Sequence, residues 1–189
     1  MKIEEKKFQK MLVILSAASG GKTAKASSVF NDWLKHRNLP KTVRGFFERN
    51  APVQMIWAGS GYLFDITEIM RVNDKFPDTV SDELLFIGSS PNGDFIALDY
   101  GCGNGRVGYV SHDMMYLDTS LRRFFIPVAG SIGDFIFKAN NKEDFPSDYF
   151  DVAKYDTDTA CWLPYNETTG EFGCLRKKDE YEQVKGGLQ

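Results

Sequence analysis

The chain has 189 residues, of which 42% are hydrophobic and 14% are aromatic. This composition excludes an intrinsically disordered protein, and the length is that of a single globular domain with a substantial core. The formal net charge is −3, but residues 1–50 hold eleven Lys and Arg against four Asp and Glu, a net +7, so the other 139 residues carry −10. The basic end could bind nucleic acid and the acidic part a basic protein, or both could be ordinary solvated surfaces.

Residues 1–26 are interpreted as a helical extension. The apolar run at residues 11–15 follows several lysines, as in a signal peptide, but its five residues are too few for one. Apolar residues recur there at helical spacing, and Gly20-Gly21 can end the helix. These residues are Phe8, Met11, Leu12 and Leu15. No apolar run is long enough to span a bilayer.

Two further helices are expected before residue 52. Ser27 or Ser28 can cap the first, and Pro40 suits the first turn of the second. Pro52 prevents the second helix from continuing. The expected apolar faces are Val29, Phe30, Trp33 and Leu34 in the first helix and Val43, Phe46 and Phe47 in the second.

The next segment alternates strands with polar signals. Residues 53–57 are predicted to form a strand that returns through residues 62–64 after a Gly-Ser-Gly turn. Asp65, with Glu68 three residues later, has the capping-box pattern of a short helix. Residues 73–83 are polar and are expected to form a loop.

A three-stranded antiparallel meander is predicted over residues 84–87, 95–100 and 106–111. The turn residues at 89–93, Ser-Ser-Pro-Asn-Gly, supply the backbone conformations of a tight reversal, and residues 101–105 supply a second one.

The remaining residues predict a closing helix and a hairpin. Pro127 is expected to open the helix, and the hairpin pairs residues 161–165 with residues 171–175. The apolar positions of the helix are Val128, Ile132, Phe135, Ile136 and Ala139. The three cysteines, Cys102, Cys161 and Cys174, cannot all pair, which favours a reducing compartment and a cytoplasmic location, although Cys161 and Cys174 could face each other across the hairpin.

Four segments, in this order, resemble the SUKH superfamily. They are Leu39–Phe47, Ile66–Asn73, Leu84–Asp113 and Val128–Ile136, with an "LP" helix opening, an "iG" pair closing a strand and a "V.yv.hd" strand. The superfamily includes a fungal cell-wall assembly regulator and many bacterial immunity proteins. The resemblance implies a SUKH-like domain at residues 27–142, an extension at 1–26 and a C-terminal extension at 143–189 packed on the same domain.

Several residues could carry chemistry, but each has a simpler interpretation. Residues 16–23, SAASGGKT, approach a phosphate-binding loop, yet Ser16 replaces the first glycine and the chain lacks the strand-helix alternation of a nucleotide-binding sheet. His36 and His112 are interpreted as surface or turn residues. The acidic run with Asp148, Asp151, Asp156 and Asp158 lacks the pattern of a calcium-binding loop.

Together these observations predict an α+β protein with N-terminal helices, a central twisted antiparallel sheet, a closing helix and a C-terminal hairpin extension. The resemblance implies a non-catalytic immunity protein that neutralises a basic toxin, with no cofactor, metal or membrane, and without direct nucleic-acid binding. Asp94, Asp99, Tyr100 and Asp113 are the predicted partner-binding residues, and turn chemistry is their alternative role. A regulatory protein-interaction scaffold is the second hypothesis, and an enzyme that uses the loop at Lys22 is the third.

Overall fold

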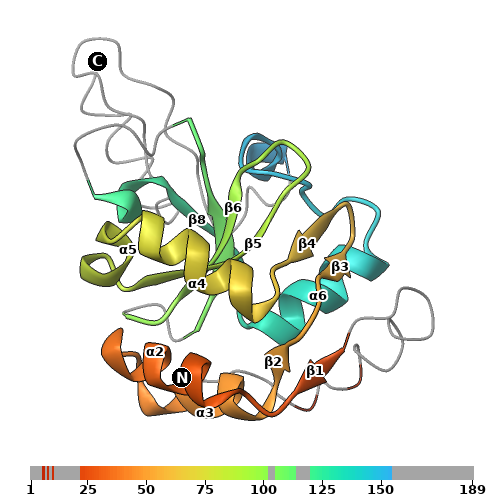
Figure 1. Ribbon diagram of the computed structural model, residues 1–189. Helices are drawn as coiled ribbons and strands as arrows, with labels where there is room; N and C mark the ends of the chain where they lie inside the picture. Colours follow the sequence, from red (N-terminus) through yellow and green to blue (C-terminus); the bar gives the residue numbers. More distant parts are fainter. Residues whose placement is uncertain are drawn as a thin grey trace.

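A computed structural model describes residues 6, 8, 10, 22–101, 105–113 and 120–154 and has an α+β architecture (Figure 1). Its centre is an antiparallel sheet in the order β3-β4-β5-β6-β7-β8, in which each strand pairs with its neighbour in sequence. The strands are β3 (Ile56–Ala58), β4 (Gly61–Leu63), β5 (Leu84–Ser89), β6 (Phe95–Asp99), β7 (Val107–Val110) and β8 (Phe125–Ala129). A separate antiparallel pair joins β1 (Thr23–Ala24) to β2 (Ala51–Pro52).

Helices cover both faces of the sheet. They are α2 (Ser28–His36), α3 (Lys41–Arg49), α4 (Ile66–Lys75), α5 (Asp78–Ser81) and α6 (Ile132–Asn141), with the 3-10 turns η1 (Leu121–Phe124) and η2 (Phe150–Lys154). Phe76, after α4, contacts Phe95 at 5.6 Å between ring centroids. On α6, Phe135 contacts Tyr109 at 5.9 Å, and the cross-strand partner of Tyr109 is Ile96. Phe95 and Ile96 are successive residues of β6, so their side chains point to opposite faces of the sheet. The helices α4 and α6 therefore lie on opposite faces. The predicted fold class is confirmed.

The helices before the sheet begin as their sequences predict. Ser27 caps α2 by accepting a hydrogen bond from the backbone N–H of Phe30 at 3.2 Å, and Phe30 and Leu34 are buried. One expectation is wrong, because Val29 is 67% exposed. The buried face of this segment is narrow and consists of residues 30, 34 and 37, and residue 29 lies outside it.

The N-terminal extension is described at three residues. Lys6, Phe8 and Lys10 are helical, and Phe8 packs edge-on against the ring of Phe46 in α3 at 5.0 Å. The rest of the predicted first helix lies outside the described residues. Phe8 is 2% exposed and therefore belongs to the core.

The predicted strand at residues 53–57 is wrong in its bounds. Pro52 ends β2, where it pairs with Thr23 of β1, and the chain then bends before β3 starts at Ile56. The two short strands thus belong to different sheets. The bend leaves Val53 and Met55 exposed, at 47% and 44%.

The predicted loop at residues 73–83 is also wrong. Asp65 caps α4 by accepting hydrogen bonds from the N–H groups of Thr67 and Glu68, both at 2.9 Å, and the helix continues to Lys75. The short helix α5 follows. Polar composition suggested a loop, but the polar side chain of Asn73 is completely buried and has hydrogen-bond partners on another element.

Asn73 fixes α4 to the edge of β5. Its amide Nδ2 donates to the carbonyl oxygen of Phe86 at 2.8 Å, and its Oδ1 accepts from the N–H of Phe86 at 2.9 Å. The short strand β4 pairs with Gly88 and Ser89 of β5, so the side chain occupies the place of a strand partner beside Phe86. Nδ2 also donates to the carbonyl of Ile69, one turn earlier in α4.

The closing helix begins later than predicted. Pro127 lies in the edge strand β8, and α6 starts at Ile132, where Ser131 accepts a hydrogen bond from the N–H of Asp134. Proline cannot donate to a sheet ladder, but an edge strand tolerates it. Gly108 allows β7 and β8 to approach closely, since a Cβ there would clash with the backbone of Ile126.

The chain after α6 packs back onto the sheet. The hydroxyl of Tyr109 in β7 donates to the carbonyl of Pro146 at 2.8 Å, and Tyr149 is 1% exposed. Burial, together with the nearby carboxylates of Asp148 and Asp151, raises the pKa of Tyr109 above its ordinary value. The predicted hairpin at 161–175, including Cys161 and Cys174, lies outside the described residues.

We expect Asn73→Ala to lower the free energy of unfolding by about 2–4 kcal/mol, because it leaves two buried backbone groups of Phe86 without partners. Urea denaturation followed by circular dichroism measures the change. Asn141→Ala is the matched control, since its amide also bonds the carbonyl four residues earlier in a helix but is exposed. A loss in Asn73→Ala no larger than in Asn141→Ala would contradict the role of the strand contact.

Candidate functional site

The carboxylate of Asp94, which precedes β6, is buried and joins three segments. Its Oδ1 accepts a hydrogen bond from the backbone N–H of His112 at 3.1 Å and lies 2.9 Å from Nδ1 of the same histidine. Its Oδ2 accepts from the N–H of Tyr149 at 3.1 Å. The turn before β6, the end of β7 and the segment before η2 therefore meet at one side chain.

The carboxylate of Asp99, at the other end of β6, is also fully buried. Its Oδ1 accepts from Arg122 Nη2 and its Oδ2 from Arg106, both at 3.0 Å. Arg122 Nη1 also donates to Oδ2 at 3.3 Å, and the N–H of Gly101 donates to Oδ1 at 3.1 Å. Burial alone would raise the pKa of Asp99, but the hydrogen bonds and charges of Arg122 and Arg106 outweigh it and lower the pKa below its ordinary value. Asp99 is thus an anion held between two guanidinium groups.

The other two predicted residues differ in exposure. Tyr100 is 8% exposed, and its hydroxyl donates to the carbonyl of Val80 at 3.4 Å. Burial raises the pKa of Tyr100, although the charge of Arg37 opposes this shift. The Asp113 side chain is 63% exposed, and its Oδ1 lies 3.2 Å from Nε2 of His112.

The four residues form two separate groups. Asp94 and Asp113 meet at His112, whereas Asp99 and Tyr100 lie at the opposite end of β6, which spans about 17 Å. The buried aspartates have the turn and anchoring roles that were the alternative to partner binding. Partner binding by these residues stays a prediction, and among the four only the side chain of Asp113 is widely exposed.

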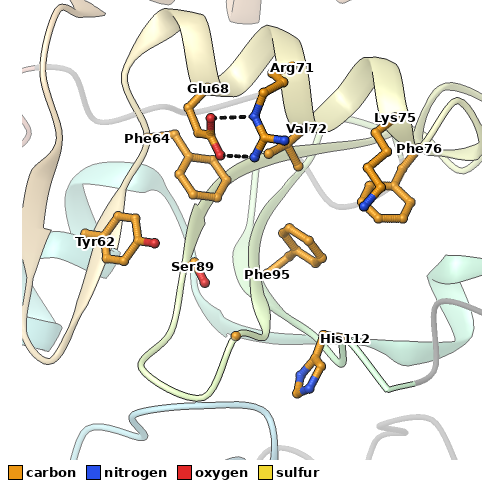
Figure 2. A pocket seen from close by; sticks show the side chains of 11 residues that line it. Tyr62, Phe64, Glu68, Arg71, Val72, Lys75, Phe76, Ser89, Phe95 and His112 are labelled. Carbon is orange, nitrogen blue, oxygen red and sulfur yellow. Dashed lines mark hydrogen bonds and ion pairs between the residues drawn. The ribbon is translucent and has the colours of Figure 1, made fainter.

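A groove of about 270 Å³ lies between α4 and the sheet (Figure 2). Strand residues form its floor, α4 forms one wall, and the turn before β6 and the end of β7 form the opposite side. The lining residues are Tyr62, Phe64, Glu68, Arg71, Val72, Lys75, Phe76, Ser89, Gly93, Phe95 and His112. No sequence pattern indicates this groove, because its lining comes from α4, from three strands and from the segments that connect them, which only the fold brings together.

Two cationic side chains of α4, Arg71 and Lys75, border the groove, and they differ in their ion pairing. Arg71 forms two hydrogen bonds to the carboxylate of Glu68, from Nε at 2.7 Å and from Nη2 at 2.5 Å. Hydrogen bonding to Arg71 lowers the pKa of Glu68, so this pair is internally neutralised. The ammonium of Lys75 lies 5.3 Å from the centre of the Phe76 ring, and among the described residues it has no carboxylate within ion-pair distance.

The stretch at residues 74–83 forms an acidic corner, which we define by Asp74, Asp78, Asp82 and Glu83. Lys75 is the single basic residue in this stretch, so the stretch carries −3, and two arginines from outside it form ion pairs with the corner, Arg37 with Asp74 at 3.6 Å and Arg122 with Glu83 at 3.8 Å. Asp82 anchors η1 by accepting hydrogen bonds from Ser120 and from the N–H of Leu121 at 2.7 Å. Val80, on α5, is 39% exposed at the centre of the corner.

Other chemistry has little basis in the described part of the chain. No group of three or more His, Cys, Asp or Glu side chains could hold a metal ion there. Thr23 lies in β1, although the corresponding threonine of a phosphate-binding loop opens a helix, and residues 16–21 lie outside the described ranges. His36 is exposed, as predicted.

Comparisons with known proteins give no relative. No protein-family model, curated protein or solved structure matches the chain. Among the helices described, none has the length and apolar character needed to cross a membrane.

We expect Asp99→Asn to lower stability at pH 7 by about 2 kcal/mol, because two arginines lose their charged acceptor. A lowered folded-state pKa gives stability above the unfolded-state pKa of about 3.9 and loses it as the pH falls through the folded value. The variant should therefore lose less stability than the parent between pH 4 and pH 2, as urea denaturation at each pH would show. Asp32→Asn, whose exposed carboxylate pairs with Lys35, is the control. Parallel pH profiles for Asp99→Asn and the parent would contradict this account.

We expect Asp94→Ala to raise the amide exchange rate of Tyr149 by about tenfold or more, because its N–H loses its buried acceptor. Hydrogen exchange followed by NMR measures this. Asp113→Ala removes an exposed carboxylate near the same histidine and should leave the exchange of Tyr149 unchanged. Equal exchange in both variants would show that Asp94 does not hold this segment.

Proposed function

We propose that the chain is a non-catalytic protein-binding protein of the SUKH type, and most concretely an immunity protein that neutralises a cognate toxin. The sequence resemblance to the SUKH superfamily motivates the family. Its expected order of N-terminal helices, antiparallel meander and closing helix agrees with the order of α2, α3, β5–β7 and α6. This agreement supports the proposal at the level of the fold.

The observation that carries the proposal is the acidic corner around Val80. Asp78 and Glu83 are exposed on either side of this half-exposed apolar side chain, and Asp82 is fixed by its hydrogen bonds to η1. A basic toxin would be attracted by the carboxylates, which speed encounter, while Val80 offers an apolar contact that water must leave. Such a surface could cover the basic substrate site of a nuclease-like effector.

The corner is also held rigidly, which favours tight binding. Arg122 donates from Nε to the carbonyl of Asp82 at 3.0 Å, and the hydroxyl of Thr79 accepts from Arg37 at 2.8 Å. Thr79 is completely buried. A surface that is already ordered loses little conformational entropy on binding.

A regulatory scaffold is the second candidate, and the edge strand β3 favours it. Trp57 is 48% exposed on this strand, and Val53 and Met55 precede it. A second exposed apolar surface would suit further protein partners. The third candidate, an enzyme that uses Lys22, has no comparable support in the described residues.

The test is capture of the partner by the tagged full chain in its native host, followed by expression of the captured chain alone and with this protein. We expect a one-to-one complex with a chain that stops growth alone and permits growth when co-expressed. Asp78→Asn/Glu83→Gln should weaken the complex by about tenfold at low salt and less at high salt. Glu143→Gln/Asp144→Asn removes the same charge from exposed positions elsewhere and should have no effect.

Other outcomes would replace the proposal. Several weakly bound, non-toxic host proteins would favour the scaffold. A nucleotide that copurifies with the protein and is lost in Lys22→Ala would favour the enzyme. A toxin complex that both double variants weaken equally would retain immunity but move the interface away from the acidic corner.

A further inference from the structure

The floor of the groove beside α4 is a row of three residues on neighbouring strands. The register pairs Tyr62 of β4 with Ser89 of β5, and Ser89 with Phe95 of β6. Cross-strand partners point to the same face of a sheet, and side chains stand roughly perpendicular to it. Two aromatic side chains therefore rise on either side of one small residue, as Figure 2 shows.

This row leaves a slot with the width of an aromatic ring. Neighbouring strands lie about 4.8 Å apart, so the backbones of Tyr62 and Phe95 are about 9.6 Å apart. A ring placed midway above Ser89 would lie about 4.8 Å from the backbone of each neighbouring strand, a spacing similar to that between aromatic rings that attract one another. Ser89 is what keeps this space open, because a larger side chain would fill it.

Neighbouring rings hold the two aromatic walls in place, and one of them, Phe86, lies on β5, the strand that carries Ser89. Phe95 stacks on Phe86 at 4.5 Å with an angle of 12° between the ring planes, and Phe76 contacts it edge-on. Tyr62 contacts Phe64 and Trp57 edge-on, both at 5.8 Å. A ligand ring would therefore meet preformed walls, which lowers the entropic cost of binding.

The charge beside the groove indicates which substituent a bound aromatic ring would carry. Arg71 is neutralised by Glu68, whereas Lys75 leaves its ammonium at the groove without a carboxylate partner among the described residues. The groove volume of about 270 Å³ suits one ring with a small substituent. We propose that the groove binds a single-ring or indole-sized aromatic anion, with the ring between Tyr62 and Phe95 and the anionic group at Lys75. This site does not depend on the proposed immunity function.

The anionic group could be a carboxylate or a phosphate, and the test has an arm for each. The full chain, labelled with ¹⁵N, is titrated with indole-3-carboxylate and its neutral analogue indole-3-carboxamide, and with phenyl phosphate and its neutral analogue phenol. We expect at least one anion to shift the amide resonances of Ser89 and Phe95 with a dissociation constant below about 1 mM and to bind about tenfold more tightly than its neutral analogue. The arm that binds identifies the anionic group.

Two variants separate the charge from the slot. Lys75→Gln is an exposed change and should reduce the affinity of the anion to that of its neutral analogue. Phe95→Leu should weaken both the anion and the neutral analogue, because it removes one wall of the slot. Lys22→Gln removes an exposed positive charge elsewhere and should leave both affinities unchanged.

The proposal is overturned if neither anion shifts these resonances at about 1 mM, or if anion and neutral analogue bind equally. An unchanged affinity of Lys75→Gln for the anion would also overturn it. That variant alters only an exposed charge, so we expect it to fold like the parent. Binding of the aromatic anion with no toxin captured from the host would support this site and contradict the proposed function. Capture of a toxin without binding of the anion would support the proposed function and contradict this site.

Discussion

The fold depends on the buried side-chain amide of Asn73, which pairs with the part of β5 that β4 does not reach. β4 is too short to pair with the whole of β5, which would leave the N–H and carbonyl of Phe86 without partners in the interior. Asn73 satisfies both groups and thereby ties α4 to the sheet at a defined height. The carbonyl of Asn73 also accepts a hydrogen bond from the buried guanidinium of Arg37, which follows α2. The positions of α2 and α4 relative to the sheet are consequently linked at one residue.

The position of α4 then determines both candidate sites. One side of the helix forms the wall of the groove with Arg71 and Lys75, and its end leads directly into the acidic corner on α5. The two surfaces have different chemistry. The groove presents aromatic rings and the ammonium of Lys75, which has no carboxylate partner in the described part of the chain, whereas the corner presents carboxylates around Val80. A small ligand and a protein partner could therefore occupy the molecule independently.

The two aspartates at the ends of β6 stabilise the ends of the meander in different ways. Asp99 is compensated by two guanidinium groups, so it is a buried charge with full ionic partners. Asp94 is held by His112 and by two backbone N–H groups that belong to segments far apart in sequence. Breaking either set would leave an uncompensated buried carboxylate, which costs more than an exposed ion pair contributes. These hydrogen bonds and ion pairs explain why Asp94 and Asp99 are buried beside turns.

The sequence by itself determined the features whose causes lie within three or four residues. Ser27 and Asp65 each cap a helix whose first N–H groups are their immediate neighbours, and the Asn-Gly turn after β5 takes its shape from Gly93, whose φ is +91°. The periodicity of apolar residues likewise predicted the α+β class and the meander, because the repeat of a helix or a strand is local.

Only the tertiary structure decided which distant residues meet. Pro127 has the local pattern of a helix start, yet it lies in the edge strand β8, which pairs with β7. Asn73 has the local pattern of a loop, and only its hydrogen bonds to Phe86 show why it lies in a helix. The slot between Tyr62 and Phe95 exists because the register places Ser89 between them. Register and buried polar pairing depend on contacts between residues far apart in the chain, and a single sequence does not specify their alignment.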